Sequence, residues 1–225
     1  NIADSDLAQA GDYVIDIQAG EELAVAATKT YTNQLAAIAL LSAVLSEDDA
    51  RLAELMALPA AVAETLTMND RIAQVAPRYR YMDRSVIIGR GYNYATAFEL
   101  ALKMKELTYT LVEPYSSADF RHGPMAMIED GFPVLVVAPS GAMEAEMLDF
   151  VHALNDLGAE VIAISDVDAI LTAARTPLAL PASVPEWLSP ITAIAPGQLF
   201  AMHLAHTRDF DIDAPRGLRK VTETR

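Results

Sequence analysis

"FPVLVVAPSGAMEAEMLDFVHALNDLGAEVIAISD", residues 132–166, decides the fold class of this chain. Its two ends, residues 132–140 and 160–166, are nearly continuous apolar runs bounded by turn residues, which is typical of strands buried on both faces. Residues 142–159 carry a helical pattern that stops near Gly158. A strand, a helix and a second strand in this order predict a parallel sheet with a crossover helix.

The same alternation covers most of the second half of the chain. Residues 84–93, "RSVIIGRGYN", predict a strand that runs into a glycine-bearing turn, and a helix is expected from about residue 95 to residue 110. Residues 110–124 indicate an extended segment followed by a turn. After Pro177 the pattern weakens, and one more helix is expected within residues 190–210.

The first half begins with a different pattern. Residues 12–18, "DYVIDIQ", alternate and are rich in branched side chains, which predicts a short strand. A long helix should follow to about residue 46, with Thr28 or Thr30 as its N-cap.

Residues 49–79 predict one or two amphipathic helices, with Pro59 and Pro77 as interruptions. The chain is therefore expected to have an α/β fold of two tandem doubly wound units, with parallel sheets, flanking helices and an incomplete first unit. We place the boundary near residue 80, so that residues 1–80 end the first unit and residues 81–225 form the second. Because the first elements resemble the middle of a fold, we expect the chain to be part of a longer protein.

Composition excludes several classes of protein. The chain has 225 residues, of which 52% are hydrophobic and 21% charged, as expected of a globular protein. The net charge of −15 argues against a nucleic-acid partner, but it allows a small phosphorylated ligand held by a few local cations. The longest apolar stretch, residues 35–45, is shorter than the roughly 20 residues of a membrane span. The absence of cysteine excludes disulfides and thiolate chemistry and suits the cytoplasm, where we expect the protein.

A helix with both acids and lysines is the first candidate for a site. Glu99, Lys103 and Glu106 share the spacing of one helix face, beside an apolar stripe. The set is either a solvated Glu–Lys pair worth about 0.2–0.5 kcal/mol or the floor of a pocket. Its position after a strand that ends in a glycine turn favours the pocket, because open α/β sheets bind ligands there. Arg90 in that turn is a candidate anion ligand.

Two further segments carry candidate functional residues. His122 stands beside Gly123 and Pro124 in a rigid turn, and the tail "DAPRGLRKVTETR" from residue 213 concentrates basic residues at the end of an acidic chain. The four histidines of the chain lack a set of carboxylate or thiolate partners, so we predict neither a metal site nor a cofactor.

Four stretches together resemble the SIS-domain phosphosugar isomerases, in particular the isomerase part of glutamine–fructose-6-phosphate aminotransferase and its glutaminase-free deaminase and isomerase relatives. These stretches are "GEELAVAATKTYTNQL" (20–35), "GRGYNYATAFELALKMKELTY" (89–109), "EPYSSADFRHGPMAMI" (113–128) and "DAPRGLRKVT" (213–222). The resemblance covers nearly the whole chain in the order of the family, and it implies a fold of SIS type.

The resemblance also implies a role for each matching residue. Lys220 matches the tail lysine that forms a Schiff base with the opened keto sugar, and Glu106 matches the carboxylate that moves a proton between C1 and C2. His122 matches the histidine that opens the sugar ring from the neighbouring subunit, which implies a homodimer. The remaining matches line the pocket or border the sugar: Glu99, Lys103, Val25 and Thr28.

Some features depart from the pattern of the synthase. The phosphate-binding turn Ser-x-Ser-Gly-x-Thr and the glutaminase nucleophile are absent from this sequence, and Ala27 stands where the family usually has serine. The stretch "EPYSSADFRHGP" is more similar to the relatives that lack glutaminase. Our first hypothesis is therefore a glucosamine-6-phosphate deaminase. The alternatives are the isomerase portion of a synthase and a non-catalytic sugar-phosphate sensor.

Overall fold

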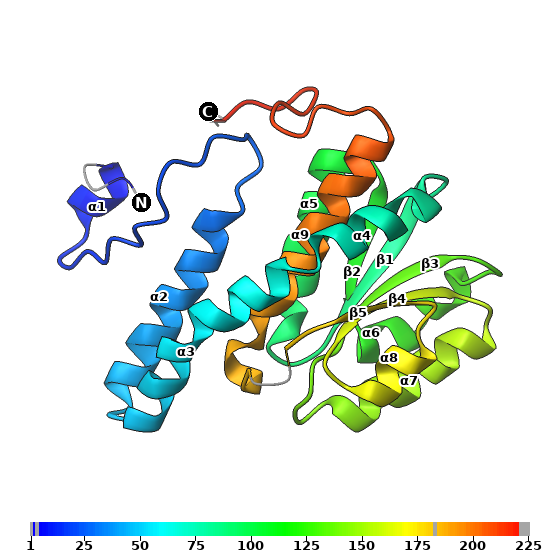
Figure 1. The fold of residues 1–225 in the computed structure, drawn as a ribbon, viewed down its shortest axis with the longest axis horizontal. Coiled ribbons are helices and arrows are strands. Elements are labelled where there is room, and N and C mark those ends of the chain that lie inside the picture. The colour runs from blue at the N-terminus through cyan, green and yellow to red at the C-terminus, as the bar shows by residue number, and fades with distance from the viewer. Residues whose placement is uncertain (1, 3–4, 182–183, 221–225) are drawn as a thin grey trace.

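A computed structural model, which describes residues 2, 5–181 and 184–220, has a parallel sheet of five strands in the order β2-β1-β3-β4-β5 (Figure 1). The strands are β1 (Arg84–Gly89), β2 (Leu111–Ser116), β3 (Pro133–Val137), β4 (Glu160–Ser165) and β5 (Thr176–Ala179). β1 is an interior strand, since Val86 aligns with Glu113 of β2 on one side and with Val134 of β3 on the other, and β3 lies in the middle of the sheet. The predicted α/β class and parallel sheet are confirmed.

Helices cover both faces of this sheet. The α-helices are α1 (Asp6–Ala10), α2 (Lys29–Leu45), α3 (Asp49–Leu66), α4 (Asn69–Val75), α5 (Asn93–Thr108), α6 (Ser117–Arg121), α7 (Glu144–Asp156), α8 (Asp168–Ala173) and α9 (Ser189–Thr207). The short 3-10 helices are η1 (Ala76–Tyr79), η2 (Pro124–Met127) and η3 (Glu186–Leu188).

The apolar strands explain the two-sided packing. All five residues of β3 are buried, and alternate strand residues face opposite sides of the sheet. Ile87 and Leu135 join the core that includes α5 and α9, whereas Val86 and Val134 join the core that includes α6, α7 and α8. α5 and α9 therefore lie side by side on one face (Figure 1).

The N-terminal helices pack on α9 as well. α2 and α3 form an antiparallel pair, and Ala39 and Leu58 from these helices share a small core with Leu188 and Ile191. Pro59 lies inside α3, so the interruption predicted at this proline is wrong. Although proline removes one helical donor, the burial of residues on both sides of it keeps the helix continuous.

Residues 12–18 do not form a strand, which corrects the prediction from their alternation. Backbone N–H and C=O groups of a strand need a partner strand, and the described part of the chain gives this segment none. Its apolar side chains are exposed, with Tyr13 at 96% and both Val14 and Ile15 at 55%. Four short elements, α1, α6, α8 and β5, were not predicted, because each has six residues or fewer.

The predicted division near residue 80 remains a prediction. Contacts cross it, because Ile72 and Tyr79 belong to the same core as Phe200 and the hydroxyl groups of Tyr79 and Thr176 are 2.5 Å apart. Every helix in the described ranges is too short or too polar to cross a membrane.

At two glycines the neighbouring atoms lie too close for a Cβ atom, so alanine substitutions there test the packing. A Cβ atom at Gly89 would lie 2.1 Å from the backbone oxygen of Asn93, where β1 turns into α5. A Cβ atom at Gly197 would lie 2.6 Å from the flexible Cδ atoms of Leu100. We expect Gly89→Ala to lower the free energy of unfolding by about 3 kcal/mol, because the backbone cannot move aside.

We expect Gly197→Ala to lower this free energy by about 1–2 kcal/mol, less than Gly89→Ala, because its clash is with the side chain of buried Leu100, which can shift farther than the backbone. Urea unfolding of the two variants measures both values. A Gly89→Ala protein as stable as the wild type would contradict the tight turn between β1 and α5.

Candidate functional site

The acids and lysine of α5 form a buried charged group rather than a solvated pair. Lys103 is 3% exposed, and its Nζ lies 2.6 Å from Oε2 of Glu106 and 3.6 Å from Oε1 of Glu99. A buried ammonium costs several kcal/mol unless opposite charges surround it. The two carboxylates meet this need, so the three side chains hold one another in a fixed arrangement.

Burial also changes the acid–base properties of this group. It is the largest influence on Glu99 and raises the pKa of its carboxyl group, with Lys103 opposing the rise and Glu106 adding to it. Burial, with a further contribution from Glu99, raises the pKa of Tyr31 to about 12, and the Tyr31 hydroxyl has no hydrogen-bond partner. Sequence analysis did not identify Tyr31, because nothing in its local pattern indicates a neighbour 68 positions away.

The location of this group differs from the expected one. α5 starts beside the carboxyl end of β1 and ends just before β2 begins, so it runs from the carboxyl edge of the sheet to the amino edge. Glu106 is 13 residues beyond Asn93, which corresponds to about 20 Å of helix. The expectation that the acids lie at the glycine turn was therefore wrong, since it considered where the helix begins and not its length.

Arg90 and His122 lie at the opposite edge from Glu106. Arg90 follows β1, and its Nε is 3.6 Å from Oε2 of Glu146. Glu146 also accepts a hydrogen bond of 2.7 Å from Ser117. His122 follows α6 and is exposed. Within one chain the structure does not bring these two residues to the α5 group.

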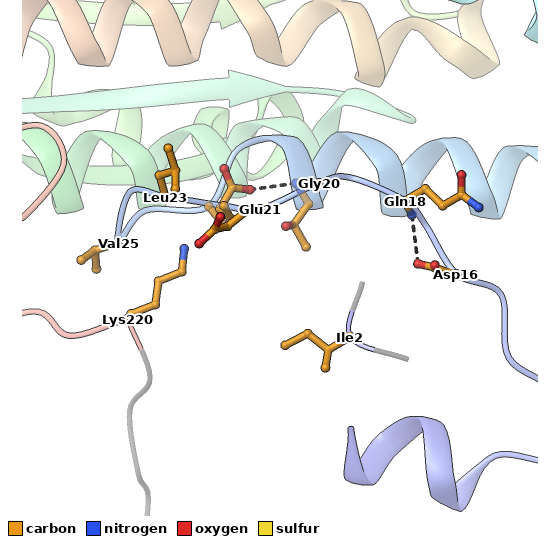
Figure 2. Close-up of a pocket in the computed structure, with 11 residues that line it drawn as sticks. Ile2, Asp16, Gln18, Gly20, Glu21, Leu23, Val25 and Lys220 are labelled. Carbon is orange, nitrogen blue, oxygen red and sulfur yellow. Dashed lines mark hydrogen bonds between the residues drawn. The ribbon is translucent and has the colours of Figure 1, made fainter. Parts of the chain in front are cut away.

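The basic tail folds back onto the segment before α2. The N–H of Val25 donates a hydrogen bond of 3.0 Å to the carbonyl of Asp213, and Nζ of Lys220 donates to the carbonyl of Ala24. Figure 2 shows the Lys220 amine directed toward the segment that carries Leu23 and Val25. Residues 221–225, which include part of the predicted basic tail, lie outside the described residues.

Two hollows lie on the two sides of residues 24–28. A pocket of about 910 Å³ is lined by Val25, Ala27 and Lys220 together with acidic residues such as Glu21. A second cavity of about 370 Å³ is lined by Ala24, Ala26, Thr28, Lys103 and Gln198. Val25 and Ala27 line the first pocket, whereas Ala24, Ala26 and Thr28 line the second, so this segment is a shared wall between Lys220 and the Lys103 group.

The side chain of Glu22 holds the wall in place by capping α2 from outside the helix. Glu22 Oε2 accepts hydrogen bonds from the N–H groups of Thr28 at 3.1 Å and Thr30 at 2.9 Å. Burial acts to raise the pKa of Glu22, but the two N–H groups outweigh it and lower that pKa. The predicted N-cap position at Thr28 is confirmed, but the Thr28 side chain makes no capping hydrogen bond, and Glu22 supplies the acceptor instead.

The structure thus brings together Val25, Thr28 and Lys220 at one wall, and Glu99, Lys103 and Glu106 behind it. Sequence analysis missed Glu22, Tyr31 and Gln198 at this site. The Nε2 atom of Gln198 is buried without a hydrogen-bond partner. In the described ranges, no group of three or more acids, histidines or cysteines is placed to hold a metal ion.

Comparisons with known proteins agree with this architecture. The SIS domain family profile matches residues 80–208. Glutamine–fructose-6-phosphate aminotransferase (isomerizing) from Pyrococcus horikoshii is 38% identical over 225 residues, which cover 98% of this chain and 38% of that relative. The chain therefore spans less than half of this curated relative.

Solved structures show the same fold. The C-terminal domain of glucosamine-fructose-6-phosphate aminotransferase from Francisella tularensis superimposes with a TM-score of 0.88 and 28% identity, over 96% of this chain and 64% of that one. The glucosamine-6-phosphate deaminase of Thermotoga maritima has a TM-score of 0.67 and 23% identity, over 89% and 58% of the two chains. The second similarity shows the fold alone.

The raised pKa of Glu99 makes stability depend on pH in a defined direction. Because the pKa is higher in the folded state, the contribution of Glu99 to stability is full below its ordinary value of 4.5 and is lost as the pH rises through the folded value. Glu99→Gln imitates the protonated form. We expect the variant to gain stability over the wild type as the pH rises from about 4 to about 8.

Urea unfolding across this pH range measures the difference. Glu64→Gln is the matched control, since Glu64 is an exposed glutamate of α3. A constant difference between Glu99→Gln and wild type at every pH would show that burial does not govern this carboxyl group.

Proposed function

The chain belongs to the SIS domain family, and we propose that it supplies the catalytic part of a glucosamine-6-phosphate deaminase. Such an enzyme interconverts glucosamine 6-phosphate with fructose 6-phosphate and ammonia. The observation that carries the proposal is the pairing of Glu106 with buried Lys103 on α5, with Lys220 folded onto the adjacent wall at Ala24. An acid and an amine are the two groups that this reaction requires, and the Lys220 amine must leave the Ala24 carbonyl and pass residues 24–28 to reach a sugar that contacts Glu106.

The proposed reaction starts from the open-chain amino aldehyde, after His122 has opened the ring. The Glu106 carboxylate removes the proton from C2 and returns it at C1. The C1 oxygen gains a proton and the amine loses one, so that the aldehyde becomes a hydroxymethyl group and the C2 amine becomes an imine. The Lys220 amine adds to C2 and ammonia leaves, which produces a lysine Schiff base. Water then releases fructose 6-phosphate and restores the free lysine.

Each remaining residue has a role that follows from its position. Lys103 donates to Glu106 at 2.6 Å and thereby orients the carboxylate that must reach both carbons. Glu99 holds the other side of the Lys103 ammonium. Val25 and Thr28 line the wall at which the sugar would lie. Arg90 lies away from this wall, so we do not include it in the proposed site.

A second enzyme is supported by one observation. The P. horikoshii aminotransferase matches 98% of this chain at 38% identity, which favours the isomerase portion of a synthase. The two activities share the chemistry at C1 and C2 and differ in the source of nitrogen. Glucosamine 6-phosphate formed only with glutamine would identify the synthase. A non-catalytic sensor would bind a sugar phosphate without converting it, and it would have no use for the paired acid and the tail lysine.

We also propose that the active protein is a homodimer in which His122 completes the site of its partner. Three exposed side chains form a stripe along α5, Tyr94, Phe98 and Leu102, which are 37%, 50% and 45% exposed. They lie on the helix that leads to Glu106, and an exposed apolar stripe of this kind is typical of a contact surface.

A cytoplasmic location remains a prediction.

The first test is the substitution of the proposed proton carrier. In the full-length protein we expect Glu106→Gln to lower the rate of ammonia release from glucosamine 6-phosphate by at least about 100-fold in a protein that remains folded, with a lower melting temperature because buried Lys103 loses a charged partner. Glu113→Gln is the control, because Glu113 is an exposed carboxylate on β2. Wild-type turnover by Glu106→Gln would exclude the proposed role.

The second test concerns the subunit boundary. Glu106→Gln and His122→Ala should each be inactive as a pure protein. If His122 serves the partner's site, refolding an equal mixture of the two variants should restore roughly a quarter of the activity, because half of the dimers are mixed and each has one intact site. Absence of recovery, in a mixture shown to contain mixed dimers, would mean that His122 acts within its own chain or not at all.

A further inference from the structure

The end of α5 holds the start of the tail through an arginine. Arg208 Nη1 donates to the carbonyl of Thr108 and to Oγ1 of Thr110, both at 2.9 Å. Its Nη2 donates to the carbonyl of Met82. Arg208 therefore fixes the last turn of α9 to the end of α5 and the start of β1. The tail leaves from this point.

Tyr109 makes the next contact along the tail. It ends α5 in the left-handed conformation, with φ 56° and ψ 21°, which costs about 1 kcal/mol or more for a residue with a Cβ atom. Its ring centroid is 4.8 Å from that of Phe210 and 4.0 Å from the Arg216 guanidinium carbon. Its hydroxyl oxygen accepts a hydrogen bond of 2.8 Å from the Arg216 N–H.

Ile212 packs against the main core and Pro215 is buried, but few contacts other than that of Tyr109 hold the tail beyond Pro215. Residues 216–220 are exposed, so they bury little apolar surface. Apart from Tyr109, the described hydrogen bonds that link residues 211–220 to other segments join Asp213 to Val25 and Lys220 to Ala24. Both of these go to the wall. Tyr109 is thus the tie between the tail and the helix that carries Glu106, three residues earlier.

We propose that Tyr109 is a positioning residue that fixes the tail against α5 and so sets the location of Lys220 relative to Glu106. The inference rests on the proposed function for the role of Lys220, but the tie itself is independent of that role. Without the tie, the amine would remain attached to the wall alone. The chemical step would then slow, whereas sugar binding at the wall would change little.

The test uses Tyr109→Phe and Tyr109→Leu in the full-length protein. The first variant removes only the hydroxyl, and the second also removes the stacking with Phe210 and Arg216. Tyr81→Phe is the matched control, since the Tyr81 hydroxyl donates to the carbonyl of Gly131, away from the tail. Brief digestion with trypsin followed by mass spectrometry measures cleavage after Arg216.

We expect cleavage after Arg216 to be about 3- to 10-fold faster in Tyr109→Phe, as the loss of one hydrogen bond implies, and faster still in Tyr109→Leu. The kcat for ammonia release should fall in the same order with KM nearly unchanged. Tyr81→Phe should match the wild type, and Tyr109→Phe should keep the melting temperature of the wild type.

Three results would overturn the proposal. Wild-type cleavage of Tyr109→Phe would show that the tie does not hold the tail. Faster cleavage with a wild-type kcat would show that the tie does not position Lys220. An equal effect in Tyr81→Phe would make the change nonspecific. If the wild type converts no amino-sugar phosphate, the proposed function fails, and the digestion still decides whether Tyr109 holds the tail.

Discussion

The buried ammonium of Lys103 is the constraint on which the site depends. A cation at 3% exposure has lost nearly all contact with water, so it must be surrounded by groups of opposite charge. Glu99 and Glu106 provide them from the same helix, one on each side. The requirement for charge compensation fixes all three side chains and leaves a carboxylate in a defined orientation close to the second cavity.

The wall at residues 24–28 is the second part of the candidate site and lies beside this charged group. Glu22 closes the segment by capping α2 from six and eight residues away, and the tail adds Lys220 to its other side. The segment before α2 and the C-terminal tail thus meet near the C-terminal end of α5. α6 and the residues around it lie toward the other edge of the sheet (Figure 1). A site at the amino edge departs from the usual position of ligands in open α/β sheets, and the departure follows from the length of α5.

The relation to the SIS domain family supports a common fold. The chain covers 38% of the P. horikoshii aminotransferase, so its similarity to this relative concerns only that part of the aminotransferase. The family resemblance indicated Glu106, His122 and Lys220 as catalytic candidates. The structure adds a reason for considering two subunits, because His122 and Glu106 lie at opposite edges of one sheet.

From the sequence alone, the strands β1, β3 and β4 and the helices α5, α7 and α9 could be predicted, because long apolar runs and a helical period are local properties. The short elements α8 and β5 carry neither signal. The sequence also identified Glu99, Lys103 and Glu106 as one face of a helix. Only the tertiary structure decided that this face is buried, that Glu22 rather than a threonine caps α2, and that Tyr31 and Tyr109 adjoin the site. Such contacts depend on how separate segments pack, which no local pattern records. Residues 12–18 show this as well, because their alternation indicates a strand but a strand forms only where a partner strand is present.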